Sequence, residues 1–285
     1  MTLAPTAAGD RSVRVIRPTR SLVQILSAGL TELWSHKSLF LEMTLLRLRV
    51  RYKQSLLGWT WAVLPSLVLM ITYTLIFSKL IGLKGDDLPY ALFIFSGLIP
   101  WTFFSTSVST ATAGIVTHRY LISRVAFPRE IIPLSYVAAA LVDLGIGMVM
   151  LAAMMCYFGF SSRLNTLYAI PVIGMLIIFS SAVALCCSSF QARFRDIGVA
   201  MPLLLQVLMF TTPVVYSSAA IPQNVKAIYF ANPLAIVIEA FRQAATSGVS
   251  PDAGAMIYCG TVSIVCLVFS YILFKRLDGT LPDVI

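Results

Sequence analysis

The sequence has 285 residues, of which 58% are hydrophobic and only 12% are charged, with a mean hydropathy of +0.87. Soluble domains are nearer half apolar and a quarter charged, so the composition excludes an ordinary soluble domain. The net charge of +9 does not indicate nucleic-acid binding, because the Lys and Arg residues are confined to short segments between apolar runs. We therefore expect an all-α integral membrane protein.

The first 56 residues precede the long apolar runs and are predicted to lie at the inner face of the membrane. Residues 1–20, with two prolines and several arginines, are typical of a flexible cytoplasmic tail. Within residues 21–56, helical spacing of apolar side chains predicts an amphipathic helix on the membrane surface. An ordinary cytoplasmic helix packed on a partner is the alternative. The spaced side chains are Leu22, Ile25, Leu26, Leu30, Leu33 and Trp34.

A basic collar closes this segment. On a helix, Arg47 and Arg51 form one row of cations. Arg49 and Lys53 form another row on nearly the opposite side, so this turn is excluded from hydrocarbon and is expected at the lipid headgroups. The collar and the interface residues that follow it are Arg47, Arg49, Arg51, Tyr52, Lys53, Gly58 and Trp59.

Residues 57–276 are predicted to form a domain of six transmembrane helices. A helix needs roughly 20 apolar residues to cross about 30 Å of hydrocarbon, and six runs qualify: residues 58–80, 90–116, 131–158, 167–190, 199–216 and 253–274. Sixteen of the 21 Lys and Arg residues fall on one side of these runs, which predicts that both termini are cytoplasmic. Residues 277–285 form the C-terminal cytoplasmic tail.

Between the fifth and sixth runs, residues 219–250 contain a further apolar stretch that is too short to cross. Residues 228–241 are apolar but are broken by Asn232 and Pro233. Glu239 and Arg242, three residues apart, also favour an interfacial position. We expect this segment to be re-entrant from the extracytoplasmic side.

The sequence contains no recognisable catalytic or metal-binding pattern. It has two His residues, no G-x-S-x-G or H-E-x-x-H motif and no Walker motif. A stand-alone membrane enzyme, such as a polyprenyl-sugar transferase, would need an acidic or histidine site at the membrane surface, which we do not find. Asp143 is the single acid inside a span, and the sequence offers it no basic partner buried at a comparable depth. A polar contact to another helix or a wet channel is favoured over a proton relay.

Two inner loops, residues 117–130 and 191–198, mix apolar and charged side chains. In the first loop, Tyr120 and Phe127 lie among arginines, and in the second, Phe194 lies between Arg193 and Arg195. Such short segments are suited to a groove on a cytoplasmic partner, while their charges contact its rim. The alternative is that they are orientation signals with incidental apolar residues.

Several motifs in order resemble the membrane subunit of type 2 ATP-binding-cassette exporters, in the branch that exports O-antigen and teichoic-acid type polysaccharides. The resemblance covers roughly residues 22–276. The motifs are Arg51-Tyr52-Lys53-Gln54-Ser55, Leu57-Gly58-Trp59 with Trp61, Trp101-Thr102-Phe103-Phe104-Ser105, Phe127-Pro128-Arg129-Glu130, Arg195-Asp196, Thr212-Pro213-Val214-Val215-Tyr216, Asn232-Pro233-Leu234 and Phe241-Arg242.

The resemblance implies a homodimer in the bacterial cytoplasmic (inner) membrane, assembled with two copies of a separate ATPase subunit. ATP and Mg would be bound by that partner, with no cofactor and no catalytic residue in this chain. The implied substrate of the complex is a lipid-linked polysaccharide, which is exported through a tunnel. The alternative is an exporter of drugs or small lipids from the same permease family, which the Arg-Tyr-Lys and Phe-Pro-Arg motifs disfavour.

The resemblance also assigns roles to residues. Coupling to the ATPase falls on Arg119, Tyr120, Leu121, Ile122, Phe127, Pro128, Arg129, Glu130, Phe194, Arg195 and Asp196. The channel lining is assigned to aromatic residues, because the apolar faces of sugars can slide over aromatic rings. These residues are Tyr73, Phe77, Trp101, Phe104 and Tyr216. The gate segment contains Asn232, Pro233, Glu239 and Arg242. The collar lies where a lipid-linked substrate arrives, although contact of its cations with the bilayer is favoured over contact with the substrate.

Overall fold

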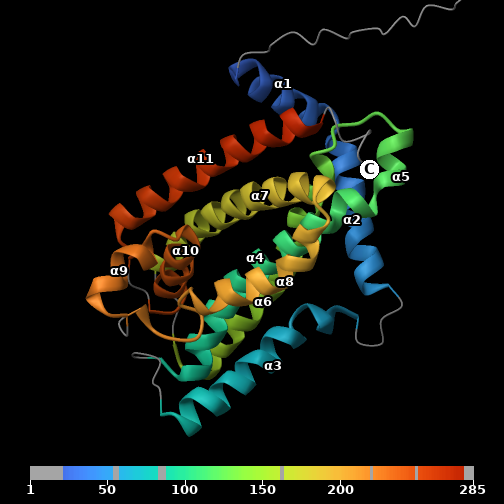
Figure 1. Cartoon of the computed structure of the whole chain (residues 1–285). Helices are drawn as coiled ribbons and strands as arrows, with labels where there is room; N and C mark the ends of the chain where they lie inside the picture. Colours follow the sequence, from blue (N-terminus) through green and yellow to red (C-terminus); the bar gives the residue numbers. More distant parts are fainter. Residues whose placement is uncertain are drawn as a thin grey trace, which may run out of the picture.

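The structure is a computed structural model that describes residues 22–53, 58–82, 88–160, 164–218, 221–247 and 250–278. The predicted tail of residues 1–20, residues 54–57 and residues 279–285 lie outside the described part. Helices are the regular elements of the described chain, as the composition predicts. Figure 1 shows them as an elongated bundle in which the long helices run roughly along one direction.

The elements follow one another along the chain as a series of long helices joined by short helical turns. They are α1 (Leu22–Ser35), α2 (Lys37–Tyr52), η1 (Gly58–Ala62), α3 (Leu64–Tyr73), η2 (Thr74–Leu80), α4 (Tyr90–Thr117), α5 (Arg119–Arg124), α6 (Ile131–Tyr157), η3 (Leu164–Tyr168), α7 (Ala169–Arg193), α8 (Asp196–Phe210), α9 (Gln223–Phe230), α10 (Pro233–Arg242), η5 (Gln243–Ser247) and α11 (Ala253–Asp278).

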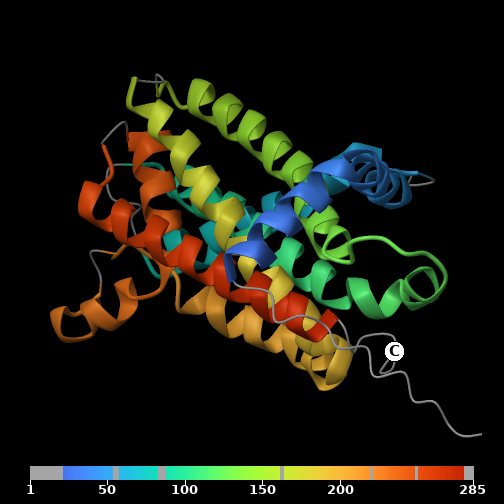
Figure 2. The same cartoon turned by 90° about the horizontal axis from the view of Figure 1, so that it is seen from above.

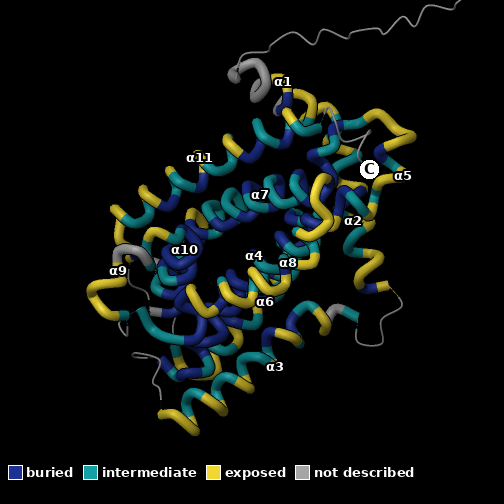
Figure 3. The backbone as a smooth tube through the Cα atoms, viewed as in Figure 1, coloured by how far each residue is buried: buried dark blue, intermediate teal, exposed yellow. Residues whose placement is uncertain are grey.

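Helix α4 is the centre of the bundle. It packs between α6 and α7, and it also contacts α3, α8 and α10, while α11 packs on α7. It carries no charged side chain, and its buried residues lie around the whole circumference, which is typical of a helix that is covered on all sides. Phe93, Phe95 and Phe103 of α4 are fully buried in the main apolar core. In Figure 3, α4 and α10 are largely in the buried colour.

Within the residues that the structure describes, four helices are long and apolar enough to cross a membrane: α4, α6, the helical stretch Thr166–Arg193 and α11. The first and fifth predicted runs instead form the shorter apolar helices Leu64–Leu80 and Asp196–Phe210. The first run does not form one continuous helix from residue 58. Gly58 has a positive φ of 51°, and Pro65 occupies the first turn of α3, so a separate 3-10 turn precedes that helix.

The amphipathic segment consists of two helices. A turn at His36 separates α1 from α2, and the two pack on different parts of the bundle, α1 on α11 and α2 on α6. At the other end of the chain, α11 continues through Asp278, so the first two residues of the predicted tail are helical.

The bundle has two chemically different ends, which both views place far apart. Helix α5, the turn between α7 and α8, and the last turn of α11 lie together at one end. Helices α9 and α10 lie at the opposite end (Figures 1 and 2). We call these the α5 end and the α9 end. The apolar stretch of residues 228–241 forms the last residues of α9 and most of α10, where Asn232 and Pro233 start the second helix.

Candidate functional site

The two rows of collar cations on α2 have different surroundings. Arg47 contacts α6: its Nε donates to Ser135 Oγ at 2.8 Å, and its guanidinium lies 3.3 Å from the centre of the Tyr136 ring. Arg49 and Lys53 on the other row are exposed. The predicted row of Arg47 and Arg51 is present on α2 and faces protein. The second row is only partly helical, because α2 ends at Tyr52 and Lys53 is its C-cap residue with an extended backbone. The side chain of Trp59 lies outside the described part of the structure.

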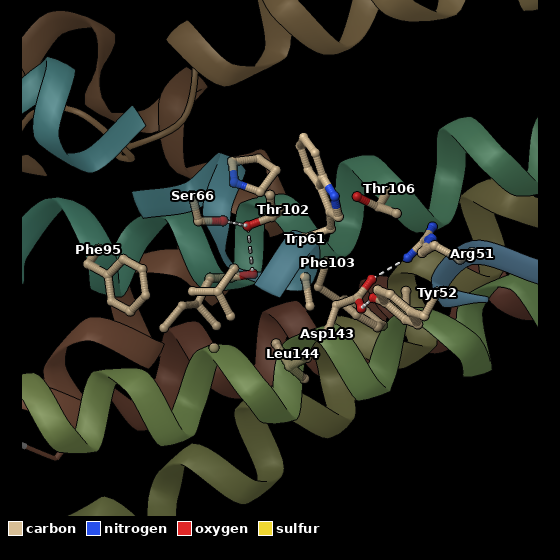
Figure 4. Close-up of a pocket in the computed structure, with 16 residues that line it drawn as sticks. Arg51, Tyr52, Trp61, Ser66, Phe95, Thr102, Phe103, Thr106, Asp143 and Leu144 are labelled. Carbon is tan, nitrogen blue, oxygen red and sulfur yellow. Dashed lines mark hydrogen bonds and ion pairs between the residues drawn. The ribbon is translucent and has the colours of Figure 1, made fainter. Parts of the chain in front are cut away.

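Asp143 of α6 is the partner of the inward-facing row. Its carboxylate accepts hydrogen bonds from Arg51 Nη1 and from the Tyr52 hydroxyl, as Figure 4 shows. The expectation that no basic partner of Asp143 lies at a comparable depth is therefore wrong, because Arg51 reaches it from α2. Burial, and next the bond to Asp143, raises the pKa of Tyr52 to about 12, so the phenol remains a donor at neutral pH. The predicted polar contact to another helix is confirmed.

Arg51 also lines two cavities, one on each side of the end of α2. The first, drawn in Figure 4, has a volume of about 230 Å³ and lies between η1, α3, α4 and α6. Its polar lining includes Ser66, Thr102 and Thr106 besides the Arg51–Asp143 pair. The second has a volume of about 380 Å³ and lies between α2, α4 and α6. Arg51 is therefore held by Asp143 and lines both cavities.

The α5 end presents large exposed side chains from both predicted loops. Tyr120 of α5 is 65% exposed, and Phe194, which follows α7, is 58% exposed. Arg124 lies over the Tyr120 ring at 4.0 Å, so cation and aromatic form one projecting unit. The remaining exposed members of the predicted coupling set are Arg119, Arg195 and Asp196. Leu121 and Phe127 are half-buried, and Ile122 and Pro128 are buried against the bundle.

The last two predicted coupling residues contact α11. Glu130 is 0% exposed: its Oε1 lies 2.6 Å from Lys275 Nζ and accepts a hydrogen bond from Tyr271 at 3.0 Å. Arg129 Nη1 donates to Asp278, to the carbonyl at 2.6 Å and to the carboxylate at 3.0 Å. In this conformation both side chains bind the end of α11 and not an external surface.

Lys275 joins three segments at the α5 end. Besides Glu130, its ammonium reaches Glu32 of α1 at 3.3 Å. We call Glu32, Glu130, Tyr271 and Lys275 the ionic junction. Sequence reasoning missed it, since Glu32 and Lys275 are 243 positions apart, and no local spacing relates them. The one feature of the sequence that could have indicated the ionic junction is the presence of charged residues next to apolar helices.

Arg242 organises the α9 end. It is 3% exposed, pairs with Glu239 at 3.1 Å and donates to the carbonyl oxygen of Pro213 at 2.6 Å. Its guanidinium lies 3.8 Å from the centre of the Phe93 ring of α4. A buried guanidinium needs such partners, because an unpaired buried charge is costly. One side chain thus joins α4, α10 and the segment after α8.

The other gate residues and the predicted tunnel aromatics have distinct positions. Asn232 Oδ1 accepts from the backbone amide of Leu234 at 3.0 Å and caps α10, which Pro233 begins. Trp101 and Phe104 are only 5% and 2% exposed inside the bundle, where Phe104 stacks on Phe179. The half-buried members of the set are Tyr73, Phe77 and Tyr216.

Comparison with known proteins places this geometry in context. Residues 39–245 match the family described as ABC-2 type transporter. The chain is 29% identical over 203 residues to an O-antigen export system permease protein RfbA of Klebsiella pneumoniae, covering 71% of this chain and 78% of the relative. It is 28% identical over 239 residues to the protein of that name from Myxococcus xanthus, covering 83% and 91%. It is also 24% identical over 230 residues to the polysialic acid transport protein KpsM of Escherichia coli, covering 80% and 89%.

Proposed function

The chain belongs to the ABC-2 type transporter family, and we propose that it is the channel-forming membrane subunit of an ATP-driven exporter of a lipid-linked polysaccharide. The observation that carries this proposal is similarity to O-antigen and polysialic acid transport proteins along 71 to 83% of the chain. The four long apolar helices agree with a multi-pass membrane protein. The chain itself is a permease and not a catalyst, and the ATP and Mg bind to a separate subunit.

The proposed arrangement has the α5 end in the cytoplasm of a bacterium and the α9 end outside the inner membrane. Six crossings would include α3 with η2 and α8. Helix α8 has 15 residues, or about 22 Å, which is less than about 30 Å of hydrocarbon. The segment after it would complete the crossing, and the α9–α10 pair would be re-entrant. The distribution of Lys and Arg supports this orientation.

Two copies of the chain would form the tunnel. Helix α8 supports this by exposing a row of apolar side chains at Val199, Leu203 and Val207, which a partner copy or lipid must cover. Tyr73, Phe77 and Tyr216 remain the candidates for the tunnel wall. We leave Trp101 and Phe104 out of the wall, because one copy of the chain already buries them.

The α5 end would bind two copies of the ATPase subunit. Exposed aromatic and basic side chains support this, because interface anchors are enriched in aromatic residues and Arg. Tyr120 and Phe194 are the proposed anchors, and Arg119, Arg124, Arg195 and Asp196 are the proposed rim. The ionic junction would pass the motion of the α5 segment to α11 and α1, since Lys275 of α11 pairs with Glu130 and with Glu32 of α1.

The lipid-linked substrate would arrive beside α2. Arg49 and Lys53 are free to contact lipid headgroups, while Arg51 is held beside two cavities. The exposed row would therefore set the depth of α2 in the inner leaflet. Arg51 is the cation of this group that is best placed to meet a substrate held inside the protein.

Deletion of the gene in its host tests this proposal. We expect the cell-surface polysaccharide to disappear and the lipid-linked polymer to accumulate inside, with both changes reversed by the intact gene. A host variant in which the neighbouring ATPase is inactive serves as the matched control and should show the same accumulation. Unchanged surface polysaccharide, with altered export of a drug or small lipid instead, would overturn the proposed substrate class.

A further inference from the structure

A large cavity lies at the α9 end, away from the collar and from the α5 end. It has a volume of about 600 Å³ and is lined by residues of α9, α10, η5 and the start of α11, and by Ser218. Sites for small ligands have volumes of about 300–1,000 Å³ and combine apolar walls with a few placed polar groups. The cavity therefore has the size of a site for a small ligand or for one segment of a longer chain.

The lining of this cavity is divided into a polar and an apolar part. Lys226, Glu239, Gln243 and Asp252 supply donors and acceptors. Phe230, Ile236 and Met256 supply the apolar part. A ligand that fits both parts must have an apolar face and an edge with several hydrogen-bonding groups.

The central carboxylate of the polar part is held in place. Glu239 Oε2 accepts from Arg242 at 3.1 Å, and Oε1 accepts from Gln243 Nε2 at 3.3 Å. Arg242 is in turn fixed by the carbonyl of Pro213. A carboxylate offers roughly four acceptor positions, so two remain for a ligand. Preorganisation of this kind reduces the entropic cost of binding.

We propose that this cavity binds one or two sugar rings of the exported polymer as they leave the membrane. The inference rests on the proposed function. A pyranose has an apolar C–H face for the apolar wall and hydroxyls for Glu239, Gln243 and Asp252. A divalent cation fits less well, because donors occupy both Glu239 oxygens and Lys226 adds a positive charge. An acyl chain fits less well, because it leaves the polar groups unpaired.

The test measures binding of oligosaccharides to the full-length chain in nanodiscs by saturation-transfer NMR. The probes are fragments released from the surface polysaccharide of the host, together with a panel of neutral and acidic trisaccharides. Gln243→Leu removes the amide from the cavity, and Gln223→Leu is the matched control on the exposed start of α9. Met256→Trp fills the cavity from its apolar side and leaves the polar wall unchanged.

We expect the wild type to bind the host fragments saturably. Gln243→Leu should weaken the affinity tenfold or more, and Met256→Trp should abolish binding. The affinity of Gln223→Leu should lie within twofold of the wild-type affinity. Equal binding by all four proteins overturns the site, as does the absence of saturable binding by the wild type to any probe. Binding of Ca²⁺ alone also overturns it. The export function is tested separately: it is refuted if deletion of the gene leaves the surface polysaccharide of the host unchanged. In that case, binding of the trisaccharide panel alone decides whether the cavity is a sugar site.

Discussion

The two ends of the bundle hold their charges in different ways. At the α9 end, Glu239 and Arg242 are one helical turn apart, and Arg242 is buried and bonded to a backbone carbonyl. At the α5 end, the ionic junction joins side chains from distant segments, and its Glu32 is half exposed. A local buried pair stabilises one arrangement, whereas a junction between separate helices can change partners when those helices move. We therefore expect the α9 end to act as a fixed scaffold and the α5 end to move during transport.

Arg242→Ala should have the largest effect on stability. It leaves the Glu239 carboxylate without its main partner and removes the bond to Pro213, which we expect to cost about 3–5 kcal/mol. Thermal unfolding of the purified protein in nanodiscs measures this loss of stability. Lys79→Ala, at an exposed cation, is the control and should change little. Equal unfolding midpoints for the two variants would contradict a scaffold role for Arg242.

Lys275→Met should have the next largest effect. The buried Glu130 carboxylate loses its cation, and we expect a loss of about 2 kcal/mol, since Lys275 is partly exposed. Adding Glu130→Gln removes the uncompensated charge and should restore part of the stability. The double-mutant cycle, measured by the same unfolding assay, gives the coupling energy between the two side chains. Additive losses would mean that the ionic junction does not act as a unit.

Gly97→Ala should reduce stability by about 1–2 kcal/mol through the same scaffold. A Cβ at this position would lie 2.6 Å from Arg242 Nη2 and 3.0 Å from the Val214 carbonyl oxygen. Gly145→Ala on α6 is the matched control, because its Cβ meets no atom within 4 Å. That variant should be neutral or stabilising. A neutral Gly97→Ala would show that the α9 end adapts more easily than the comparison implies.

Tyr120→Ala with Phe194→Ala should have the smallest effect on stability and a large effect on coupling. Both rings are exposed, so their loss should change the free energy of unfolding by less than about 0.5 kcal/mol. Co-purification with the ATPase subunit should fall at least tenfold. The control is Tyr157→Ala, because Tyr157 is an exposed aromatic residue at the end of α6. Normal co-purification of the double variant would remove these residues from the docking surface.

The sequence predicted what depends on local pattern. Long apolar runs predicted the helices α4, α6, α7 and α11, and helical spacing predicted the row of Arg47 and Arg51 on α2. The partner of Asp143 could not be predicted, because Arg51 reaches it only through the packing of α2 on α6. The burial of Glu130 has the same origin, since Lys275 and Tyr271 come from the far end of the chain. Hydropathy also treats a buried aromatic and a lipid-facing one alike, so Trp101 could not be separated from Tyr73.

The most direct test of the account is movement of the lipid-linked polysaccharide across a reconstituted membrane. The chain and its ATPase subunit are inserted into vesicles with the ATPase facing out, and protection of the glycan from an added glycosidase is followed over time. The account predicts that protected glycan accumulates only when the chain, the ATPase and hydrolysable ATP are all present. Equal accumulation without ATP, or none with the complete system although ATP is hydrolysed, would contradict it.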